Sequence, residues 1–372
     1  IAAIYAYRDA APPVDLGELR TIRDHMTARG PDGKGEWISE NGRTAMAHRR
    51  LAIIDLTEEA AQPMVSDDGK LVISFNGEIY NYRALRASLM ERGRAFNSES
   101  DTEVLLHLYA DKGAAMLDDL RGMFAFAIWD SEERSLFLAR DPFGIKPLYY
   151  ADDGKTLRVA SQVKALQAGG ALSNERDPAG TAGFLMLGSV PEPFTILRAV
   201  RALPAGSWLA ADPRGAGEPV QYFSVAAAWR DAIQSEDDLP ATEASSVLRE
   251  ALHDSVRHHQ VADVPVGAFL SAGIDSGALV GLMSEAGTPP DTVTVAFDEF
   301  RGKPEDEGPL ARQIADRYGA DHNETRVTER EFRDDFAQIL DAMDQPTIDG
   351  VNTWFAAKAA RARGLKVAIS GL

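Results

Sequence analysis

The sequence predicts two successive architectures, an α+β part with layered antiparallel sheets and then an α/β part built on a parallel sheet. The chain has 372 residues, more than one compact core usually holds. Residues 1–210 contain many short strand patterns with few helices between them, which is typical of antiparallel sheets. After residue 240 strand and helix patterns alternate, which is typical of a parallel sheet.

The first part opens with a strand of aliphatic and aromatic residues at 1–7. A helical period follows at 16–28 and ends before a Gly-Pro-Asp-Gly turn at 30–33. Further strands are expected at 44–48, 71–76, 123–130 and 135–140, helices at 82–92 and 101–112, and a hairpin-like pair at 148–151 and 157–161.

Residues 211–240 are rich in Pro, Gly, Asp and Glu, and we expect them to form an inter-domain linker. Residues 241–372 then predict a second domain. Its expected elements are an amphipathic helix at 241–259, a strand at 264–270, a helix at 278–286, a strand at 292–297, a helix at 309–318 and a strand at 367–370.

Composition excludes some classes of function. The formal net charge of −18 argues against binding to nucleic acid or to an anionic membrane, although the acidity more simply favours solubility. No apolar run approaches the roughly 20 residues that cross a bilayer. The chain has no cysteine, and therefore no disulfide framework, which fits a cytoplasmic protein.

A candidate phosphate loop lies between a predicted buried strand and a predicted helix. Its sequence is Ser271-Ala272-Gly273-Ile274-Asp275-Ser276-Gly277. We expect Gly273 to allow a positive φ and a close approach of ligand to backbone, and the first N–H groups of the helix to donate to phosphate. Two hydroxyl donors would come from Ser271 and Ser276, and Asp275 would hold Mg²⁺. The alternative is an ordinary turn in which Ser and Asp only cap the helix.

Four motifs mark a second candidate site. They are His48-Arg49-Arg50-Leu51-Ala52-Ile53-Ile54-Asp55, Asn76-Gly77-Glu78-Ile79-Tyr80-Asn81, Ser100-Asp101-Thr102-Glu103 and Arg140-Asp141-Pro142-Phe143-Gly144-Ile145-Lys146-Pro147-Leu148-Tyr149-Tyr150. Each is weak alone, since Asn-Gly is also the commonest tight-turn dipeptide. We interpret the last motif as structural support.

Together and in this order, the four motifs resemble class II glutamine amidotransferases, which have an N-terminal-nucleophile-hydrolase fold. The resemblance implies that Arg50 pairs with the α-carboxylate of glutamine, a task that suits a forked guanidinium. Asp101 and Glu78 would bind the α-ammonium. The Asn76 amide and the Gly77 N–H would form an oxyanion hole.

In that family an N-terminal cysteine is the nucleophile, and this chain matches from the family's third residue onward. Two readings remain open. Either the first residues are missing, or this homologue does not hydrolyse glutamine. We expect the chain beginning at Ile1 to bind glutamine without turning it over.

The loop at 271–277 resembles the Ser-Gly-Gly-x-Asp-Ser-Ser signature of ATP pyrophosphatases, with Ala272 and Gly277 as departures. A class II glutaminase followed by this loop is the order of the asparagine synthetase family. The resemblance implies ammonia release from glutamine, its passage inside the protein, and ATP-dependent adenylation of a carboxylate. Asparagine, glutamate, AMP and pyrophosphate would be made from aspartate, glutamine and ATP.

By the same resemblance further residues are assigned to the ATP site. Leu270 and Val295 should contact the nucleotide, and Ser370 and Gly371 should close over it, although ordinary strand core is the alternative for the first two. Leu372 stands where many family members have a glutamate associated with the adenylate intermediate. The second domain is expected to be incomplete, because the family continues with Gly-Gly-Asp-Glu.

Two alternatives to asparagine synthesis remain open. One is a specialised relative that modifies a sugar, peptide or β-amino acid, because Leu372 departs from the family pattern. The other is a non-catalytic binding or scaffold homologue. A homodimer is also left open.

Overall fold

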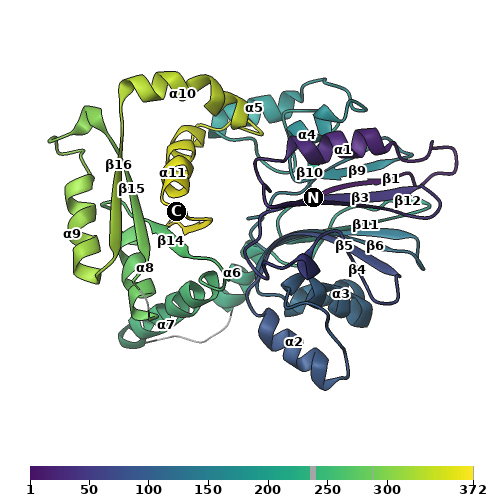
Figure 1. Ribbon diagram of the computed structural model, residues 1–372, viewed down its shortest axis with the longest axis horizontal. Coiled ribbons are helices and arrows are strands. Elements are labelled where there is room, and N and C mark those ends of the chain that lie inside the picture. Colours follow the sequence, from purple (N-terminus) through teal and green to yellow (C-terminus); the bar gives the residue numbers. More distant parts are fainter. Residues whose placement is uncertain (235–239, 288, 372) are drawn as a thin grey trace. The chain divides into compact units, whose positions relative to one another are not determined.

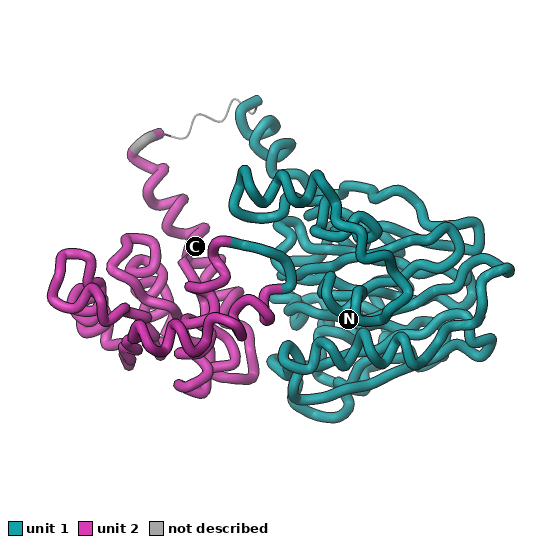
Figure 2. Tube along the Cα trace, turned by 90° about the horizontal axis from the view of Figure 1, so that it is seen from above, with its two compact units in different colours: residues 1–235, 344–347 teal, residues 236–343, 348–372 magenta. Residues whose placement is uncertain are grey.

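The computed structural model describes residues 1–234, 240–287 and 289–371, which form two compact units. Unit 1 comprises Ile1–Ser235 with Asp344–Thr347, and unit 2 comprises Glu236–Met343 with Ile348–Leu372 (Figure 2). All strand pairs of the two large sheets in unit 1 are antiparallel, and those of the sheet in unit 2 are parallel. The predicted change of architecture along the chain is therefore confirmed.

Two antiparallel sheets form the centre of unit 1. The first has the order β10-β8-β9-β1-β3-β2, and the second has the order β12-β11-β7-β6-β5-β4 with β13 paired to β11. The strands are β1 (Ala2–Tyr5), β2 (Gly33–Ile38), β3 (Thr44–Arg50), β4 (Met64–Val65), β5 (Leu71–Ile79), β6 (Gly122–Asp130), β7 (Ser135–Arg140), β8 (Tyr149–Asp152), β9 (Leu157–Ala160), β10 (Arg201–Ala202), β11 (Ser207–Asp212), β12 (Gly215–Ala216) and β13 (Val220–Gln221).

Helices cover the outer faces of these sheets, so unit 1 has four layers (Figure 1). α1 (Leu16–His25) and α4 (Val163–Ala168) lie on the first sheet, and α3 (Asp101–Lys112) lies on the second, with α2 (Tyr82–Glu91) packed against α3. The unit also contains α5 (Pro178–Leu187) and α6 (Val225–Gln234). The layering matches the α+β sheets predicted from the sequence.

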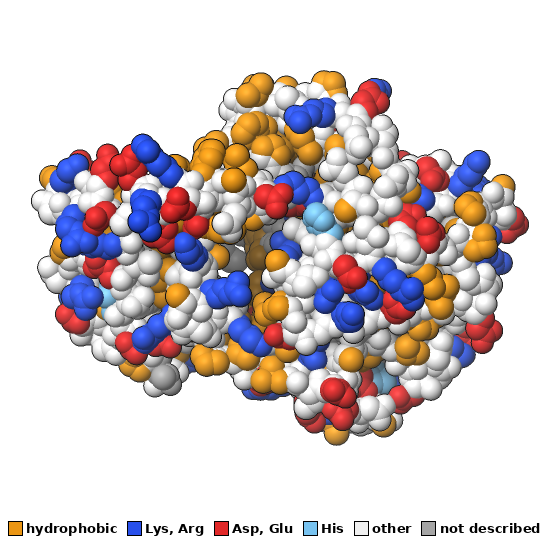
Figure 3. Space-filling view, turned by 45° about the horizontal axis from the view of Figure 1, so that its top comes forward, with side chains coloured by type: hydrophobic (Ala, Val, Ile, Leu, Met, Phe, Trp, Pro, Cys, Tyr) orange, Lys and Arg blue, Asp and Glu red, His pale blue; other side chains and the backbone are white. Residues whose placement is uncertain are grey.

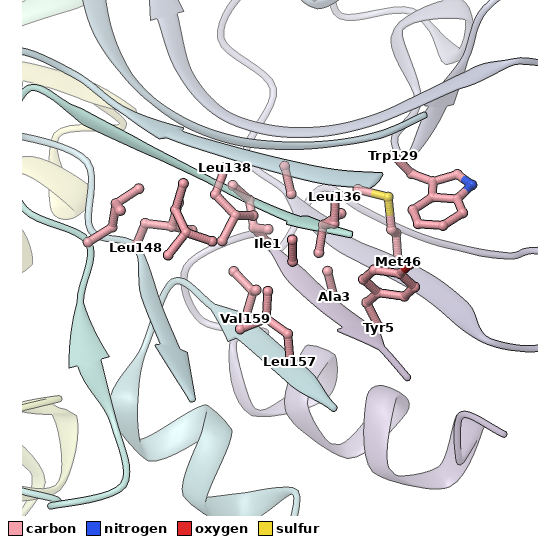
Figure 4. Packing of buried hydrophobic residues seen from close by; sticks show 14 of the residues in the cluster. Ile1, Ala3, Tyr5, Met46, Trp129, Leu136, Leu138, Leu148, Leu157 and Val159 are labelled. Carbon is pink, nitrogen blue, oxygen red and sulfur yellow. The ribbon is translucent and has the colours of Figure 1, made fainter. Parts of the chain in front are cut away.

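The core of unit 1 lies between the sheets, and β1 shows how it is built. Ala3 and Tyr5 face the second sheet, where the Tyr5 ring packs edge-on against Trp129 with ring centroids 5.0 Å apart (Figure 4). Ala2 and Ile4 face the layer of α1 and α4. Both faces of β1 are thus buried, which explains why its sequence is apolar throughout instead of alternating.

Ordered structure occupies much of the expected linker at 211–240. β11 continues to Asp212, and β12, β13 and α6 follow before residue 235. β12 and β13 are two-residue edge strands with side chains that are not buried, so they lack the hydrophobic pattern that identifies a strand. Residues 235–239 of that range lie outside the described part of the chain.

Unit 2 contains a sheet of order β16-β15-β14-β17 flanked by helices. Its strands are β14 (Val266–Phe269), β15 (Asp291–Phe297), β16 (Asp321–Val327) and β17 (Val367–Ile369), and its helices are α7 (Ala241–His259), α8 (Ile274–Glu285), α9 (Gly308–Tyr318), α10 (Glu329–Ala342) and α11 (Gly350–Ala362). Apolar residues of α8 and α9 cover one face, and those of α11 cover the other. Because the strands are parallel, the residues that follow β14 and β17 meet at one edge of the sheet.

The acidity of the chain is not gathered into one patch on the face drawn in Figure 3. On the face drawn in Figure 3, acidic and basic side chains are interspersed, although the formal net charge is −18. None of the helices within the described ranges combines the length and the apolar composition that a membrane crossing requires.

Candidate functional site

All five residues predicted to bind glutamine line one cavity of about 160 Å³ in unit 1. They are Arg50, Asn76, Gly77, Glu78 and Asp101. The cavity is smaller than the roughly 300–1,000 Å³ pockets that hold drug-sized ligands, and it suits a ligand the size of an amino acid. These five residues come from β3, β5 and α3. Because β3 and β5 belong to different sheets, the packing of the two sheets and of α3 brings together residues up to 51 positions apart, from 50 to 101.

Arg50 ends β3 and is held by the loop that follows it. Its Nη1 donates to the Thr57 carbonyl at 2.9 Å, and its Nη2 donates to the carbonyls of Ile54 and Asp55. Three of its five N–H groups are thus used, and among the described residues the other two have no acceptor. Burial lowers the pKa of Arg50, and the nearby Asp55 and Asp101 charges oppose that shift. The guanidinium remains a cation, fixed at the cavity and able to donate to an anion.

Asp55 fixes the conformation of the loop beside Arg50. Its carboxylate accepts from the Thr57 N–H at 3.0 Å and from the Glu99 N–H at 2.9 Å. The residue has a φ of +51°, an uncommon conformation that Asp tolerates better than most residues. Asp55 therefore fastens the loop that holds Arg50 to the segment that precedes α3.

Asp101 is the first residue of α3, just after the N-cap residue Ser100. Its Oδ2 accepts from the Ile79 N–H at 3.0 Å, and the residue is only 3% exposed. Its pKa is raised to about 7, mainly by burial and also by the neighbouring Glu78 charge, while the Ile79 N–H opposes the shift. An ammonium ligand would favour the ionised form, because an opposite charge nearby lowers the pKa of a carboxyl group.

Glu78 supplies the second carboxylate, and it is 2% exposed. Burial raises its pKa, and the Lys146 ammonium lowers it. Among the described residues no N–H or O–H group donates to this carboxylate. A buried carboxylate without a donor is costly, so an ammonium ligand in the cavity would stabilise it.

Asn76 and Gly77 lie inside β5, so the hairpin-turn alternative for Asn-Gly is wrong. Gly77 is opposite Phe124 of β6, and a Cβ at Gly77 would lie 2.2 Å from the Met123 carbonyl oxygen. Only glycine fits this close approach of strands. The Asn76 carboxamide lines the cavity and bonds to no residue that the structure describes, so its N–H groups are available to a ligand oxygen.

The Arg140–Tyr150 motif forms a braced loop, as its interpretation as support predicts, but it also places Lys146 in the cavity. The fully buried Asp141 carboxylate accepts from the backbone N–H groups of Phe124, Phe143, Ile145 and Lys146 at 2.9–3.2 Å. Arg140 donates to the Lys146 carbonyl at 2.8 Å and to the Gly144 carbonyl at 2.6 Å. Sequence reasoning missed Lys146 as a lining residue.

His48 and Arg29 also line the cavity and were not predicted to do so. The buried His48 shares a hydrogen bond of 3.0 Å between Nδ1 and Ser74 Oγ. Burial lowers the pKa of His48 well below its ordinary value, and the positive charges of the chain's first amine and Arg50 lower it further. The imidazole is therefore neutral at pH 7. Arg29 is exposed, and its guanidinium bonds to no other described residue.

In unit 2 the candidate phosphate loop joins β14 to α8, and α8 begins earlier than predicted, at Ile274. No side chain caps α8, so the capping alternative is wrong. Within the described ranges, the N–H groups of Ile274, Asp275 and Ser276 have no acceptor. These groups and the exposed Asp275 side chain form the open end of the loop.

Three details of this loop differ from the sequence-based expectation. Gly273 has a φ of −73°, so it does not use the left-handed region. The hydroxyls of Ser271 and Ser276 lie 2.9 Å apart and bond to each other, because the loop folds back on its own start. Ser276 Oγ also donates to the Gly273 carbonyl at 3.2 Å. These hydroxyls therefore hold the shape of the loop.

Residues after β17 lie against the same loop. A Cβ at Gly371 would be 2.9 Å from the Ser276 nitrogen and 3.0 Å from the Asp275 carbonyl carbon, so only glycine fits there. Leu270, 2% exposed, immediately precedes the loop, and Val295 lies in the adjacent strand β15. Ser370 follows β17, and Leu372 lies outside the described residues.

The predicted metal ligand Asp275 has few carboxylate neighbours. In the part of the chain that the structure describes, no group of three His, Cys, Asp or Glu side chains is arranged to hold a metal ion. Asp275 could supply one ligand to a Mg²⁺ whose other ligands are phosphate oxygens and water, a common arrangement for that ion.

Comparison with known proteins matches both halves. The glutamine amidotransferase domain family matches residues 1–223, and the asparagine synthase family matches residues 247–372. The chain is 35% identical over 364 residues to asparagine synthetase [glutamine-hydrolyzing] 1 of Bacillus subtilis (strain 168), covering 97% of this chain and 55% of the relative. It is 33% identical over 365 residues to asparagine synthetase B [glutamine-hydrolyzing] of Escherichia coli (strain K12), covering 93% and 58%.

A third relative carries a different name. The chain is 32% identical over 377 residues to amidase chry2 of Gibberella zeae (strain ATCC MYA-4620 / CBS 123657 / FGSC 9075 / NRRL 31084 / PH-1), covering 95% of this chain and 54% of the relative. The chain thus spans about half the length of the curated relatives described here, 54–58%.

Proposed function

The chain belongs to the glutamine amidotransferase domain family, with an asparagine synthase domain after it, and on that premise we propose that it serves glutamine-dependent amidation of a carboxylate. Unit 1 would take nitrogen from glutamine, and unit 2 would activate the acid with ATP. The observation that carries the proposal is the single cavity in which one forked cation, two buried carboxylates and the Asn76–Gly77 donors converge.

The charges of the cavity suit the groups of glutamine. Arg50 would donate to the α-carboxylate with its remaining N–H groups, one on Nε and one on Nη1, and its positive charge strengthens those bonds. Asp101 and Glu78 would bind the α-ammonium, and their burial makes each pairing stronger than it would be in water.

The Asn76 carboxamide would donate to the side-chain oxygen of glutamine, with the Gly77 N–H as the second donor. Both groups sit on β5 and pair with β6, so their positions are fixed before charge develops on that oxygen. The sequence contains no cysteine, so we assign binding and oxyanion stabilisation to these residues and assign no nucleophile among them.

In unit 2 the N–H groups at the start of α8 would bind phosphate oxygens of ATP, because a helix N-terminus favours anions. Gly371 would keep the loop close to the end of β17, and Leu270, Val295 and Ser370 would border the nucleotide. Magnesium would neutralise phosphate charge when bound, with Asp275 as its protein ligand. Ser271 and Ser276 would act by fixing the loop.

The acid is proposed to be aspartate, activated as an acyl-adenylate, with asparagine, glutamate, AMP and pyrophosphate as products. The relatives named asparagine synthetase support this choice. A different acid is the second candidate, because a relative of similar identity is named an amidase.

An ATP–pyrophosphate exchange assay across candidate acids tests this proposal. Exchange that depends on aspartate is expected, and it should be absent without Mg²⁺. Exchange that depends on another acid would transfer the proposal to the second candidate. Protein that binds glutamine and ATP but exchanges with no acid would favour a binding homologue.

A further inference from the structure

Two cations and two carboxylates that line the cavity of unit 1 interact in series. Arg50 interacts electrostatically with Asp101, Asp101 with Glu78, and Glu78 with Lys146. Hydrogen bonds place Lys146 near Gly77, because Asp141 accepts from the N–H groups of both Lys146 and Phe124, and Phe124 lies opposite Gly77. If glutamine binds with its α-groups on Arg50 and Asp101 and its side-chain amide at Asn76 and Gly77, that amide lies near Lys146.

Lys146 is fixed by its backbone, while its side chain bonds to nothing that the structure describes. Its N–H donates to Asp141 at 2.9 Å, and its carbonyl accepts from Arg140 at 2.8 Å. No hydrogen bond or ion pair joins its ammonium to another described residue, Glu78 included.

An ammonium in this position is energetically unfavourable without an anion. Burial lowers the pKa of Lys146 and the nearby Arg29 lowers it further, while the charges of Glu78 and Asp141 oppose the shift. Arg29 also lines the cavity, so a second cation is close to Lys146. That arrangement would be stabilised by a negative charge arriving beside Lys146.

Resting on the proposed function of the cavity, we propose that Lys146 recognises the side-chain end of the bound amino acid and makes the site prefer glutamate to glutamine. Lys146 would then be a specificity residue that retains the hydrolysis product.

The chemistry of the two ligands supports this preference. Hydrolysis adds water to the side-chain amide of glutamine and releases ammonia, which leaves a γ-carboxylate in place of a neutral carboxamide. The Lys146 ammonium can donate a charge-assisted hydrogen bond to either oxygen, but with the carboxylate it also forms an ion pair of opposite charges in a buried site, so Lys146 gains more from the carboxylate than from the amide. The α-groups of both ligands are identical, so Arg50 and Asp101 contribute equally to the affinity for glutamine and for glutamate.

Calorimetry with glutamine and glutamate on four proteins tests the proposal. They are the unaltered chain, Lys146→Met, Lys146→Arg and the control Lys155→Met, which removes an exposed lysine outside the cavity. The unaltered chain should bind glutamate about tenfold more tightly than glutamine. Lys146→Met should weaken glutamate binding about tenfold and change glutamine binding less than about threefold.

The other two variants separate charge from packing. Lys146→Arg keeps the cation and should retain the preference for glutamate, and Lys155→Met should leave both affinities unchanged. An unchanged ratio of the two affinities in a folded Lys146→Met protein would overturn the role of Lys146 and leave the proposed function intact. Failure of the unaltered chain to bind either amino acid would overturn both.

Discussion

Replacing Arg50 by lysine keeps the positive charge and removes the fork. In the structure Arg50 gives three N–H groups to the carbonyls of Ile54, Asp55 and Thr57 and has two left for a ligand. A lysine has three donors on one nitrogen and cannot hold both the loop and a carboxylate by two bonds. Losing one bond to a charged group costs about 1.5–3 kcal/mol, so the Kd for glutamine should rise about 10- to 150-fold.

The same substitution should also destabilise the loop at residues 54–57. One or two lost bonds cost about 1–2 kcal/mol, which corresponds to a fall in Tm of about 2–8 °C in a unit of this size. Calorimetry with glutamine and a thermal melt would measure the two effects separately.

A matched control is Arg158→Lys, which breaks another forked arginine outside the cavity. Arg158 donates to Glu18 at 2.6 Å and to Asp153 at 2.9 Å. This variant should lower Tm by a similar amount while the Kd for glutamine stays within about twofold. If Arg50→Lys also binds glutamine with an unchanged Kd, Arg50 does not hold the α-carboxylate and the assignment is refuted.

Three further predictions follow from the geometry. Glutamine affinity should fall about tenfold per pH unit below about pH 7, because burial raises the pKa of Asp101 to about 7 and protonation removes the partner of the ammonium. Calorimetry across pH measures this dependence, and Asp101→Asn should weaken binding and make the affinity independent of pH. An affinity that does not change with pH in the unaltered chain would contradict the prediction. Asp275→Asn should reduce the rate of ATP–pyrophosphate exchange at least about 100-fold and leave the Kd for glutamine unchanged. If the folded variant lost exchange activity and glutamine affinity to the same extent, the two sites would not be separate. Gly77→Ala should destabilise unit 1 by about 3 kcal/mol or more, because its Cβ would lie 2.2 Å from the Met123 carbonyl oxygen. The control Gly277→Ala should raise Tm, because its Cβ would meet only Ile314, at 3.6 Å. An equal Tm for the two variants would contradict the close approach at Gly77.

Strands with a buried sequence pattern could be predicted well. β6 and β7 are almost continuous runs of apolar residues bounded by polar turns, and β7 occupies the predicted residues 135–140. α7 likewise spans the predicted residues 241–259, because its apolar residues recur with a helical period. Each of these elements is identified by a pattern that lies within a short stretch of sequence.

Other elements were missed although some carried a local signal. α10 was not predicted, yet Thr328 precedes it and accepts a hydrogen bond from the Glu331 N–H, an N-cap visible in the Thr-x-x-Glu spacing. α8 begins four residues before its predicted start at 278, because Gly273 and Asp275 read as turn residues in isolation. Their helical role depends on packing against the rest of unit 2.

The candidate glutamine site was predictable by resemblance, but its geometry was not. Nothing in the local pattern brings Arg50 near Asp101, since that proximity depends on how the two sheets and α3 pack and on the Asp55 link to residue 99. Lys146 was missed because its motif is interpreted from sequence as structural support, and only the four N–H bonds to Asp141 show how the loop directs residue 146 to the cavity. Contacts between residues far apart along the chain produce no periodic pattern in the sequence.

The most direct test of the account is calorimetry of the unaltered chain with glutamine and with glutamine α-amide, which lacks the α-carboxylate. The cavity described here predicts one site per chain with a Kd below about 1 mM for glutamine, in the usual range for metabolic substrates. It also predicts at least about tenfold weaker binding of the α-amide, because Arg50 then has no carboxylate to hold. Equal affinity for both ligands, or no detectable binding of glutamine, would contradict the assignment of this cavity as a glutamine site.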